Sequence, residues 1–207
     1  MSTVIVDYGV GNLFSLKSSF AAIGERAFVT KSKEDIANAE RVILPGVGAF
    51  SDAAEKLKKT GLEEAVVFAA ENGTPVLGIC LGMQLLFDRS FEYGVHDGLK
   101  LIKGEITAVD NDGGRLKIPH IGWNFLRFTK PHPLFKYVNE GEYVYFVHSF
   151  AATGCEESVI AETEYNRPVT AAAAHKNVMG CQFHPEKSGD TGLKILKAFC
   201  EIKRGTL

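Results

Sequence analysis

The first eighty residues alternate short apolar runs with stretches in which apolar side chains recur every three or four positions. Val4–Val6 is a β-branched run that ends at Asp7, and Leu13, Leu16 and Phe20 follow with helical spacing. The same pattern predicts strands over residues 27–30, 41–44 and 75–79, and helices from residue 32, over 52–59 and over 62–71. Repeated strand–helix units of this kind favour a mostly parallel central sheet with helices on both faces.

Beyond Gly104 the pattern changes to extended runs separated by turns, which predicts an antiparallel extension of the sheet. These strands are expected over residues 104–109, 124–128, 143–147, 158–163 and 169–174. Residues 190–203 carry apolar side chains on one side, which is typical of an amphipathic helix packed on a sheet. Because the sequence has no linker, repeat or low-complexity stretch, we expect one domain over residues 1–207.

A cysteine stands where the apolar run of residues 75–79 ends and a helical stretch begins. Gly78 and Gly82 flank Cys80, and residues without a Cβ let two backbone segments pass close together. The pattern is that of a nucleophile elbow, in which a reactive side chain stands on a strained turn before a helix. Taken alone it is ambiguous, because glycine-flanked small residues also occur in ordinary strand-to-helix turns.

An imidazole and a carboxylate occur together much later in the chain, at His184 and Glu186, with Pro185 between them. If the backbone before Pro185 is extended, the two side chains share a face and the proline fixes the turn that brings them into contact. Cys80, His184 and Glu186 are therefore the candidate catalytic residues, as nucleophile, proton shuttle and orienting carboxylate. A helix N-terminus and a neighbouring imidazolium both favour the reactive thiolate form of a cysteine.

Catalysis by a thiolate also requires backbone N–H groups directed at the negative oxygen of the intermediate. Leu81 supplies one candidate, because it is the first residue of the predicted helix. The other candidate is the loop Gly46, Val47 and Gly48, which follows Pro45 at the end of another predicted strand.

Composition excludes several classes of function. The net charge of −2 leaves no basic surface for nucleic acid, and no basic region precedes Asp7, so neither a signal peptide nor a membrane segment is expected. No spacing of histidine and cysteine resembles a zinc site, and we predict no metal. The four cysteines are widely spaced, which indicates a reducing cytoplasm. Three of them are expected to be core residues: Cys155, Cys181 and Cys200.

Residues 78–84 (Gly-Ile-Cys-Leu-Gly-Met-Gln) and 182–186 (Gln-Phe-His-Pro-Glu) resemble the class I, or triad, glutamine amidotransferases, whose glutaminase domain has a flavodoxin-like α/β fold. The resemblance covers the whole chain. Within that superfamily, the chain resembles the glutaminase subunits of imidazole glycerol phosphate synthases in residues 7–13, 45–50, 119–124 and 145–149.

This resemblance implies hydrolysis of L-glutamine to L-glutamate and ammonia, without a cofactor. It also implies a heterodimer in which ammonia passes to a cyclase subunit with a (β/α)8-barrel fold. That cyclase would form imidazole glycerol phosphate and aminoimidazole carboxamide ribotide in L-histidine biosynthesis. A closed passage between subunits is chemically sensible, because ammonia released into neutral water becomes ammonium and is no longer a nucleophile.

The resemblance also implies roles for six further residues. Gln84 and His148 match positions that line the glutamine pocket or its approach. Phe150 departs from the family, which commonly has tyrosine at this position. The positions that match residues facing the cyclase are Asn12, Trp123, Tyr145 and Lys187.

Three other functions remain open on the sequence. The first is a glutaminase partner of another synthase, such as the complex that forms pyridoxal phosphate, although residues 119–124 are not expected there. The second is a free-standing cysteine peptidase or γ-glutamyl hydrolase, which would act without a partner. The third is a non-catalytic binding module that keeps the fold, which the presence of Cys80, His184 and Glu186 disfavours.

Overall fold

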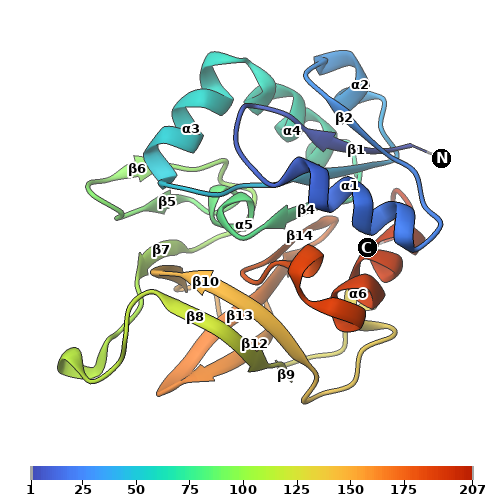
Figure 1. Ribbon diagram of the computed structural model, residues 1–207. Helices are drawn as coiled ribbons and strands as arrows, with labels where there is room; N and C mark the ends of the chain where they lie inside the picture. The colour runs from blue at the N-terminus through green and yellow to red at the C-terminus, as the bar shows by residue number, and fades with distance from the viewer. Residues whose placement is uncertain (1, 207) are drawn as a thin grey trace.

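The computed structural model describes residues 2–206, so Met1 and Leu207, the ends of the expected domain, lie outside the described residues. Its main sheet has eight strands in the order β2-β1-β3-β4-β14-β13-β12-β9 (Figure 1). The first five of these are parallel to one another: β2 (Ala27–Thr30), β1 (Thr3–Val6), β3 (Arg41–Leu44), β4 (Val76–Ile79) and β14 (Val178–Cys181). This is the 2-1-3-4-5 order of flavodoxin-like sheets, and it confirms the predicted fold class.

The remaining strands form the antiparallel extension. The main sheet continues through β13 (Arg167–His175), β12 (Val159–Tyr165) and β9 (Arg127–Phe128). A two-stranded sheet pairs β8 (His120–Phe125) with β10 (Tyr143–His148). A four-stranded sheet contains β11 (Phe150–Thr153), β7 (Glu105–Ala108), β5 (Arg89–Ser90) and β6 (His96–Asp97). The extended run predicted over residues 124–128 is divided, because Leu126 separates β8 from β9.

Helices cover both faces of the main sheet. One hydrophobic cluster joins Ile5 and Ile43 to α1 (Leu13–Ala22) and α6 (Gly189–Glu201), and α1 packs against α6. The neighbouring strand residues point to the opposite face, which is covered by α2 (Lys33–Ala37), α3 (Phe50–Lys59) and α4 (Leu62–Glu71). Three short 3₁₀ turns also occur: η1 (Asp112–Gly114), η2 (Pro133–Phe135) and η3 (Pro185–Lys187).

The predicted start of α2 agrees with the structure, because the Ser32 hydroxyl accepts a hydrogen bond from the N–H of Asp35 at 3.1 Å. A parallel arrangement places the carboxyl ends of β3, β4 and β14 at one edge of the sheet. The loop after β3, the helix α5 (Leu81–Leu85) and the turn η3 all begin there. Within residues 2–206, we find no helix with the length and apolar character needed to cross a membrane.

Candidate active site

Cys80 occupies a strained turn between β4 and α5. Its φ is 54° and its ψ is −111°, a region that residues other than glycine rarely adopt. The turn is held because the Cys80 N–H donates to the carbonyl of Cys181 at 2.8 Å. A Cβ on Gly78 would lie 2.6 Å from the Gly82 carbonyl oxygen, and one on Gly82 would overlap the Leu44 carbonyl. Both glycines are therefore required by close backbone contacts at the elbow.

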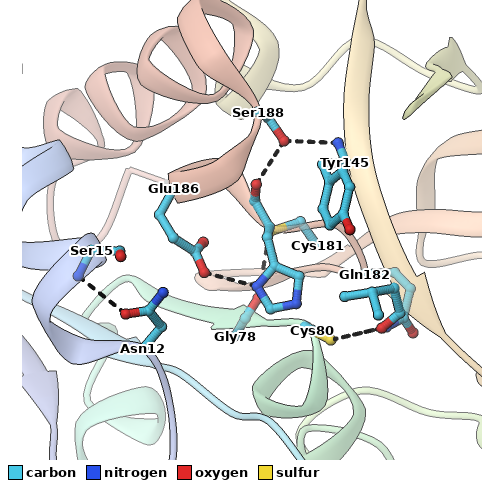
Figure 2. A network of polar contacts seen from close by, with 11 residues as sticks. Asn12, Ser15, Gly78, Cys80, Tyr145, Cys181, Gln182, Glu186 and Ser188 are labelled. Atoms are coloured by element: carbon cyan, nitrogen blue, oxygen red, sulfur yellow. Dashed lines mark hydrogen bonds and ion pairs between the residues drawn. The ribbon is translucent and has the colours of Figure 1, made fainter. Parts of the chain in front are cut away.

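The structure brings His184 and Glu186 together at the end of β14. His184 is extended, and η3 then turns the chain so that Nδ1 of His184 lies 2.8 Å from Oε1 of Glu186 (Figure 2). The backbone of His184 is fixed on both sides, since its N–H donates to the Tyr145 carbonyl and its own carbonyl accepts from the Ser188 hydroxyl. The carboxylate is thus placed to orient the imidazole.

The electrostatic surroundings favour a protonated imidazole at His184. Burial lowers its pKa, but hydrogen bonds and charge interactions with Cys80 and Glu186 outweigh burial and raise the pKa to about 9. Because Glu186 occupies Nδ1, Nε2 is left for the Cys80 sulfur. That sulfur also accepts a hydrogen bond from the side-chain amide of Gln182 at 3.7 Å.

The contribution of α5 differs from the sequence expectation. This helix has only five residues, so it offers Cys80 the N–H groups of one turn rather than the dipole of a long helix. The nearest stabilising groups are the His184 imidazole and the Gln182 amide. The sequence analysis assigned no role to Gln182, although it lies within the quoted motif.

A cavity of about 410 Å³ opens beside Cys80 and His184. Of the four predicted oxyanion residues, Val47, Gly48 and Leu81 line this cavity, whereas Gly46 does not. Gly46 instead packs on the backbone below, where an added Cβ would lie 2.6 Å from the nitrogen of Gly82. The remaining lining residues are Gln84, Glu92, Pro119, Val147, His148, Ser149, Phe150 and Lys187.

Glu92 is a second functional candidate that sequence reasoning missed. It lies in the loop between β5 and β6, and its Oε2 accepts the N–H of Phe50 at 2.7 Å. Its carboxylate lines the cavity together with Cys80 and His184. No motif surrounds Glu92 in the sequence, so only the folded arrangement identifies it.

The predicted substrate-binding residues lie together on one wall of the cavity. Gln84 donates to the Phe150 carbonyl and to the Gln182 side-chain oxygen, each at 3.0 Å. His148 also donates to the Phe150 carbonyl, at 2.9 Å. These contacts use the main chain of Phe150, so a tyrosine hydroxyl at that position is not needed for them.

Three of the four predicted partner-facing residues form one surface. Trp123 on β8 is paired with Tyr145 on β10, and Trp123 is 55% exposed. The Lys187 ammonium lies 5.8 Å from the centre of the Tyr145 ring, and Lys187 also lines the cavity. Asn12 lies elsewhere, because its side chain accepts the N–H of Ser15 at the start of α1; Figure 2 shows it on the Glu186 side of the site.

The other ionisable clusters do not form a metal site. In the described part of the chain, no group of three or more His, Cys, Asp or Glu side chains is arranged to hold a metal ion. Burial raises the pKa of Cys155, Cys181 and Cys200, and all three are buried as expected for core residues.

Comparison with known proteins identifies the family of the chain. The sequence profile of the family "Glutamine amidotransferase class-I" matches residues 4–202. The imidazole glycerol phosphate synthase subunits HisH of Caldanaerobacter subterraneus subsp. tengcongensis and Wolinella succinogenes are each 49% identical to this chain. Each alignment covers 96% of this chain, with 97% and 98% of the respective relative.

Solved structures support the same fold. A crystal structure of a glutamine amidotransferase superposes with a TM-score of 0.73 at 19% identity, covering 95% of this chain and 98% of that one. The structure of PurLQS from Thermotoga maritima superposes with a TM-score of 0.71 at 20% identity, covering 96% of this chain and 97% of that one. The chain therefore belongs to the class I glutamine amidotransferases. Within that class it is a member of the HisH family of imidazole glycerol phosphate synthase subunits.

Proposed function

We propose that this chain is the glutaminase subunit of an imidazole glycerol phosphate synthase, with residues 1–207 acting as one amidotransferase domain. It hydrolyses L-glutamine to L-glutamate and passes the ammonia to a cyclase subunit. The observation that carries this proposal is that Cys80 and the Glu186-bound imidazole of His184 line one cavity. The relatives that share about half of the sequence support the choice of synthase.

In the first half of the reaction, the Cys80 thiolate attacks the side-chain amide carbon of glutamine. The resulting oxyanion needs N–H donors, and the backbone of Val47, Gly48 and Leu81 borders the cavity where it would form. The protonated His184 then gives its proton to the amide nitrogen. The C–N bond breaks, ammonia leaves, and a thioester to Cys80 remains.

In the second half, water attacks the thioester while His184 takes the proton of that water. The C–S bond breaks, which releases glutamate and restores the Cys80 thiolate and the protonated imidazole. Glu186 holds the ring throughout, since its Oε1 remains on Nδ1.

The wall of the cavity supplies groups for the amino-acid end of glutamine. Glu92 offers a carboxylate that suits the α-ammonium group, and its Phe50 contact fixes its position. Gln84 and His148 form the adjacent wall, where their mutual contact with Phe150 restrains them. We assign substrate binding to these three residues.

The partner is a cyclase with a (β/α)8-barrel fold, bound as a heterodimer. Trp123, Tyr145 and Lys187 supply the contact surface, because they are adjacent, partly exposed and continuous with the cavity. Asn12 adds a separate contact at the start of α1. We also propose a cytoplasmic location, which suits an enzyme with a reactive cysteine and three buried thiols.

The test uses the purified chain and the purified cyclase encoded by the same genome. Glutamate release and synthesis of imidazole glycerol phosphate are measured for the chain, the cyclase and the mixture. Glutamine-dependent synthesis only in the mixture supports the proposal. Rapid glutamine hydrolysis by the chain alone, unchanged by the cyclase, would favour a free-standing hydrolase. Absence of hydrolysis in the mixture would favour a binding module.

A further inference from the structure

A second buried histidine lies behind His148. The rings of His120 and His148 come from paired strands, and the two residues are 3% and 5% exposed. His120 is stacked between Phe146 and Tyr165, with ring centres 5.0 Å and 4.1 Å away. His120 does not line the cavity and forms no part of the triad, so the reaction described above leaves it without a role.

The proton positions of the two rings follow from one carbonyl group. Nδ1 of His148 lies 2.9 Å from the Phe150 carbonyl oxygen, which can only accept, so Nδ1 carries the proton. Burial lowers the pKa of both histidines to about 4, so each ring is neutral at pH 7. Nε2 of His148 must then accept, and its donor is Nδ1 of His120 at 3.0 Å. The remaining Nε2 of His120 faces the Asn124 amide nitrogen at 3.4 Å.

The Phe150 carbonyl also fixes the orientation of two side-chain amides, those of Gln84 and Gln182. Because the Phe150 oxygen only accepts, the Gln84 atom that lies 3.0 Å from it is the amide nitrogen. This nitrogen also lies 3.0 Å from the Gln182 side chain, which must therefore present its oxygen. Gln182 then directs its own nitrogen at the Cys80 sulfur, 3.7 Å away; Figure 2 shows both residues in the site.

We propose that His120 is a positioning residue for the glutaminase reaction. Through its contact with His148, and through the contact of His148 with the Phe150 carbonyl, His120 keeps the N–H groups of the Gln182 amide directed at Cys80. An N–H group beside the sulfur stabilises the thiolate. Without its donor, the His148 ring is free to adopt the other tautomer and to release the Phe150 carbonyl. The amides can then flip, and a carbonyl oxygen would face Cys80. This inference rests on the proposed role of Cys80 as nucleophile.

Two substitutions at His120 separate the hydrogen bond from the packing. His120→Phe keeps a ring between Phe146 and Tyr165 but removes the Nδ1–H donor. His120→Asn restores a side-chain N–H near the position of Nδ1. His132→Phe is the matched control, because His132 is another histidine whose pKa burial lowers to about 4, and its Nδ1 accepts the N–H of Leu134, which caps η2.

The first measurement is the rate of Cys80 alkylation by iodoacetamide as a function of pH, with modification located by mass spectrometry and Cys80→Ser as the blank. The titratable groups that interact with Cys80 are His184, Tyr8 and Cys181, and they are unchanged in every variant. The second measurement is kcat/KM for glutamine in the assembled synthase.

The expected result is that His120→Phe slows alkylation at pH 7 by about threefold to tenfold, with a similar loss of kcat/KM. His120→Asn should return both quantities to within about twofold of the wild type, and the His132→Phe control should match the wild type. Equal alkylation rates for His120→Phe and the wild type would overturn the inference. If His120→Phe does not fold, His120→Leu removes the same donor.

A double substitution tests the connection itself. Gln182→Met removes the amide next to Cys80 at similar volume, so alkylation of this variant at pH 7 should also be slower than in the wild type. If the two residues act through one chain, the double variant is no slower than Gln182→Met alone. If the double variant instead slows alkylation by the product of the two separate effects, His120 and Gln182 act independently and the proposed connection is contradicted. The alkylation readout needs no glutaminase activity, so it distinguishes failure of this inference from failure of the proposed function.

Discussion

His184 Nδ1 lies 2.8 Å from Glu186 Oε1, and both side chains are 2% exposed. The two residues are only two positions apart, and the η3 turn lets them meet although Pro185 separates them. Oε2 of Glu186 is buried and has no protein partner among the described residues. The carboxylate therefore has one main contact, which is the imidazole that it orients.

Glu186→Gln should reduce glutamine hydrolysis less than loss of the nucleophile does. The amide keeps the size of the side chain but removes the charge that stabilises the imidazolium, so we expect a loss of about 100-fold to 10,000-fold in kcat. Steady-state glutamate release by the assembled synthase gives this value. The control is Glu142→Gln, because Glu142 forms an ion pair with Lys194 of α6 and does not line the cavity. A loss equal to that of Cys80→Ala would show that Glu186 does more than orient.

Cys80→Ala should abolish glutamine-dependent synthesis and leave ammonia-dependent synthesis intact. The thiol alone supplies covalent catalysis, whereas the cyclase only requires ammonia. Product formation is measured with glutamine and then with an ammonium salt above neutral pH. Retention of glutamine hydrolysis in Cys80→Ala would reject the assignment of the nucleophile. Loss of both activities would show that the cyclase itself is inactive in the preparation, because its use of ammonia does not require the glutaminase chain.

The two buried neutral histidines should make the protein sensitive to acid. Burial lowers the pKa of His120 and His148 from 6.5 to about 4, so the unfolded chain binds more protons than the folded one between these values. Their contribution to stability is fully present above pH 6.5 and is lost as the pH falls towards 4. The free energy of unfolding, measured with urea at pH 7 and at pH 5, should fall between these pH values by on the order of 1 kcal/mol more in the wild type than in His120→Phe. Parallel losses in the two proteins would contradict this.

The sequence could predict the elements that carry strong local signals. The elbow at Cys80 and the His184–Glu186 turn are marked by glycine and proline, whose effects act over a few residues. The sequence analysis missed β14, a strand of four residues in the middle of the sheet. Its sequence Val-Met-Gly-Cys has one β-branched residue, and β4 and β13 on either side stabilise it as a strand.

The missed parts of the site have the same cause. No motif surrounds Glu92, and the matching segment 119–124 indicates no role for His120. Each residue becomes significant only through a partner distant in sequence, Phe50 and His148 respectively. The burial that sets the protonation of His120 is also a tertiary property. Resemblance to a family assigned residues to the pocket, but it did not show which of these residues form hydrogen bonds with one another.

Trp123→Ala and Lys187→Ala should each weaken binding of the cyclase or uncouple its stimulation of glutaminase activity. A large exposed aromatic residue and a neighbouring cation are typical anchors of protein interfaces, where truncation costs about 2 kcal/mol or more. Titration of each variant against the cyclase gives the affinity, and thermal unfolding of the free chain checks the fold. The controls are Phe68→Ala and Lys58→Ala, which remove exposed side chains from α4 and α3. Wild-type affinity and stimulation in both Trp123→Ala and Lys187→Ala would remove this surface from the interface.

The chain alone should be a slow glutaminase that a cyclase carrying its nucleotide ligand accelerates strongly. The reason lies in the loop after β3, where Gly48 has a φ of +97° and Gly46 also lacks a Cβ, so that the peptide groups around Val47 can reorient at little cost. Absence of one oxyanion donor costs about 100-fold to 1,000-fold in rate. Cys80 and His184 can thus both be in place at the cavity while turnover is slow, until the partner favours the productive loop arrangement.

The test compares glutamate release by the chain alone, with cyclase, and with cyclase plus nucleotide. Gly48→Ala adds a direct probe, since alanine disfavours a positive φ by about 1–2 kcal/mol and no atom lies within 4 Å of the added Cβ. If the loop with this φ is the slow arrangement, Gly48→Ala raises the unstimulated rate severalfold and lowers the stimulation ratio. Gly113→Ala is the matched control, because Gly113 also has a positive φ and open space, and lies in η1 away from the cavity. A free chain that already runs at the fully stimulated rate would contradict gating by this loop and favour a hydrolase that acts without a partner.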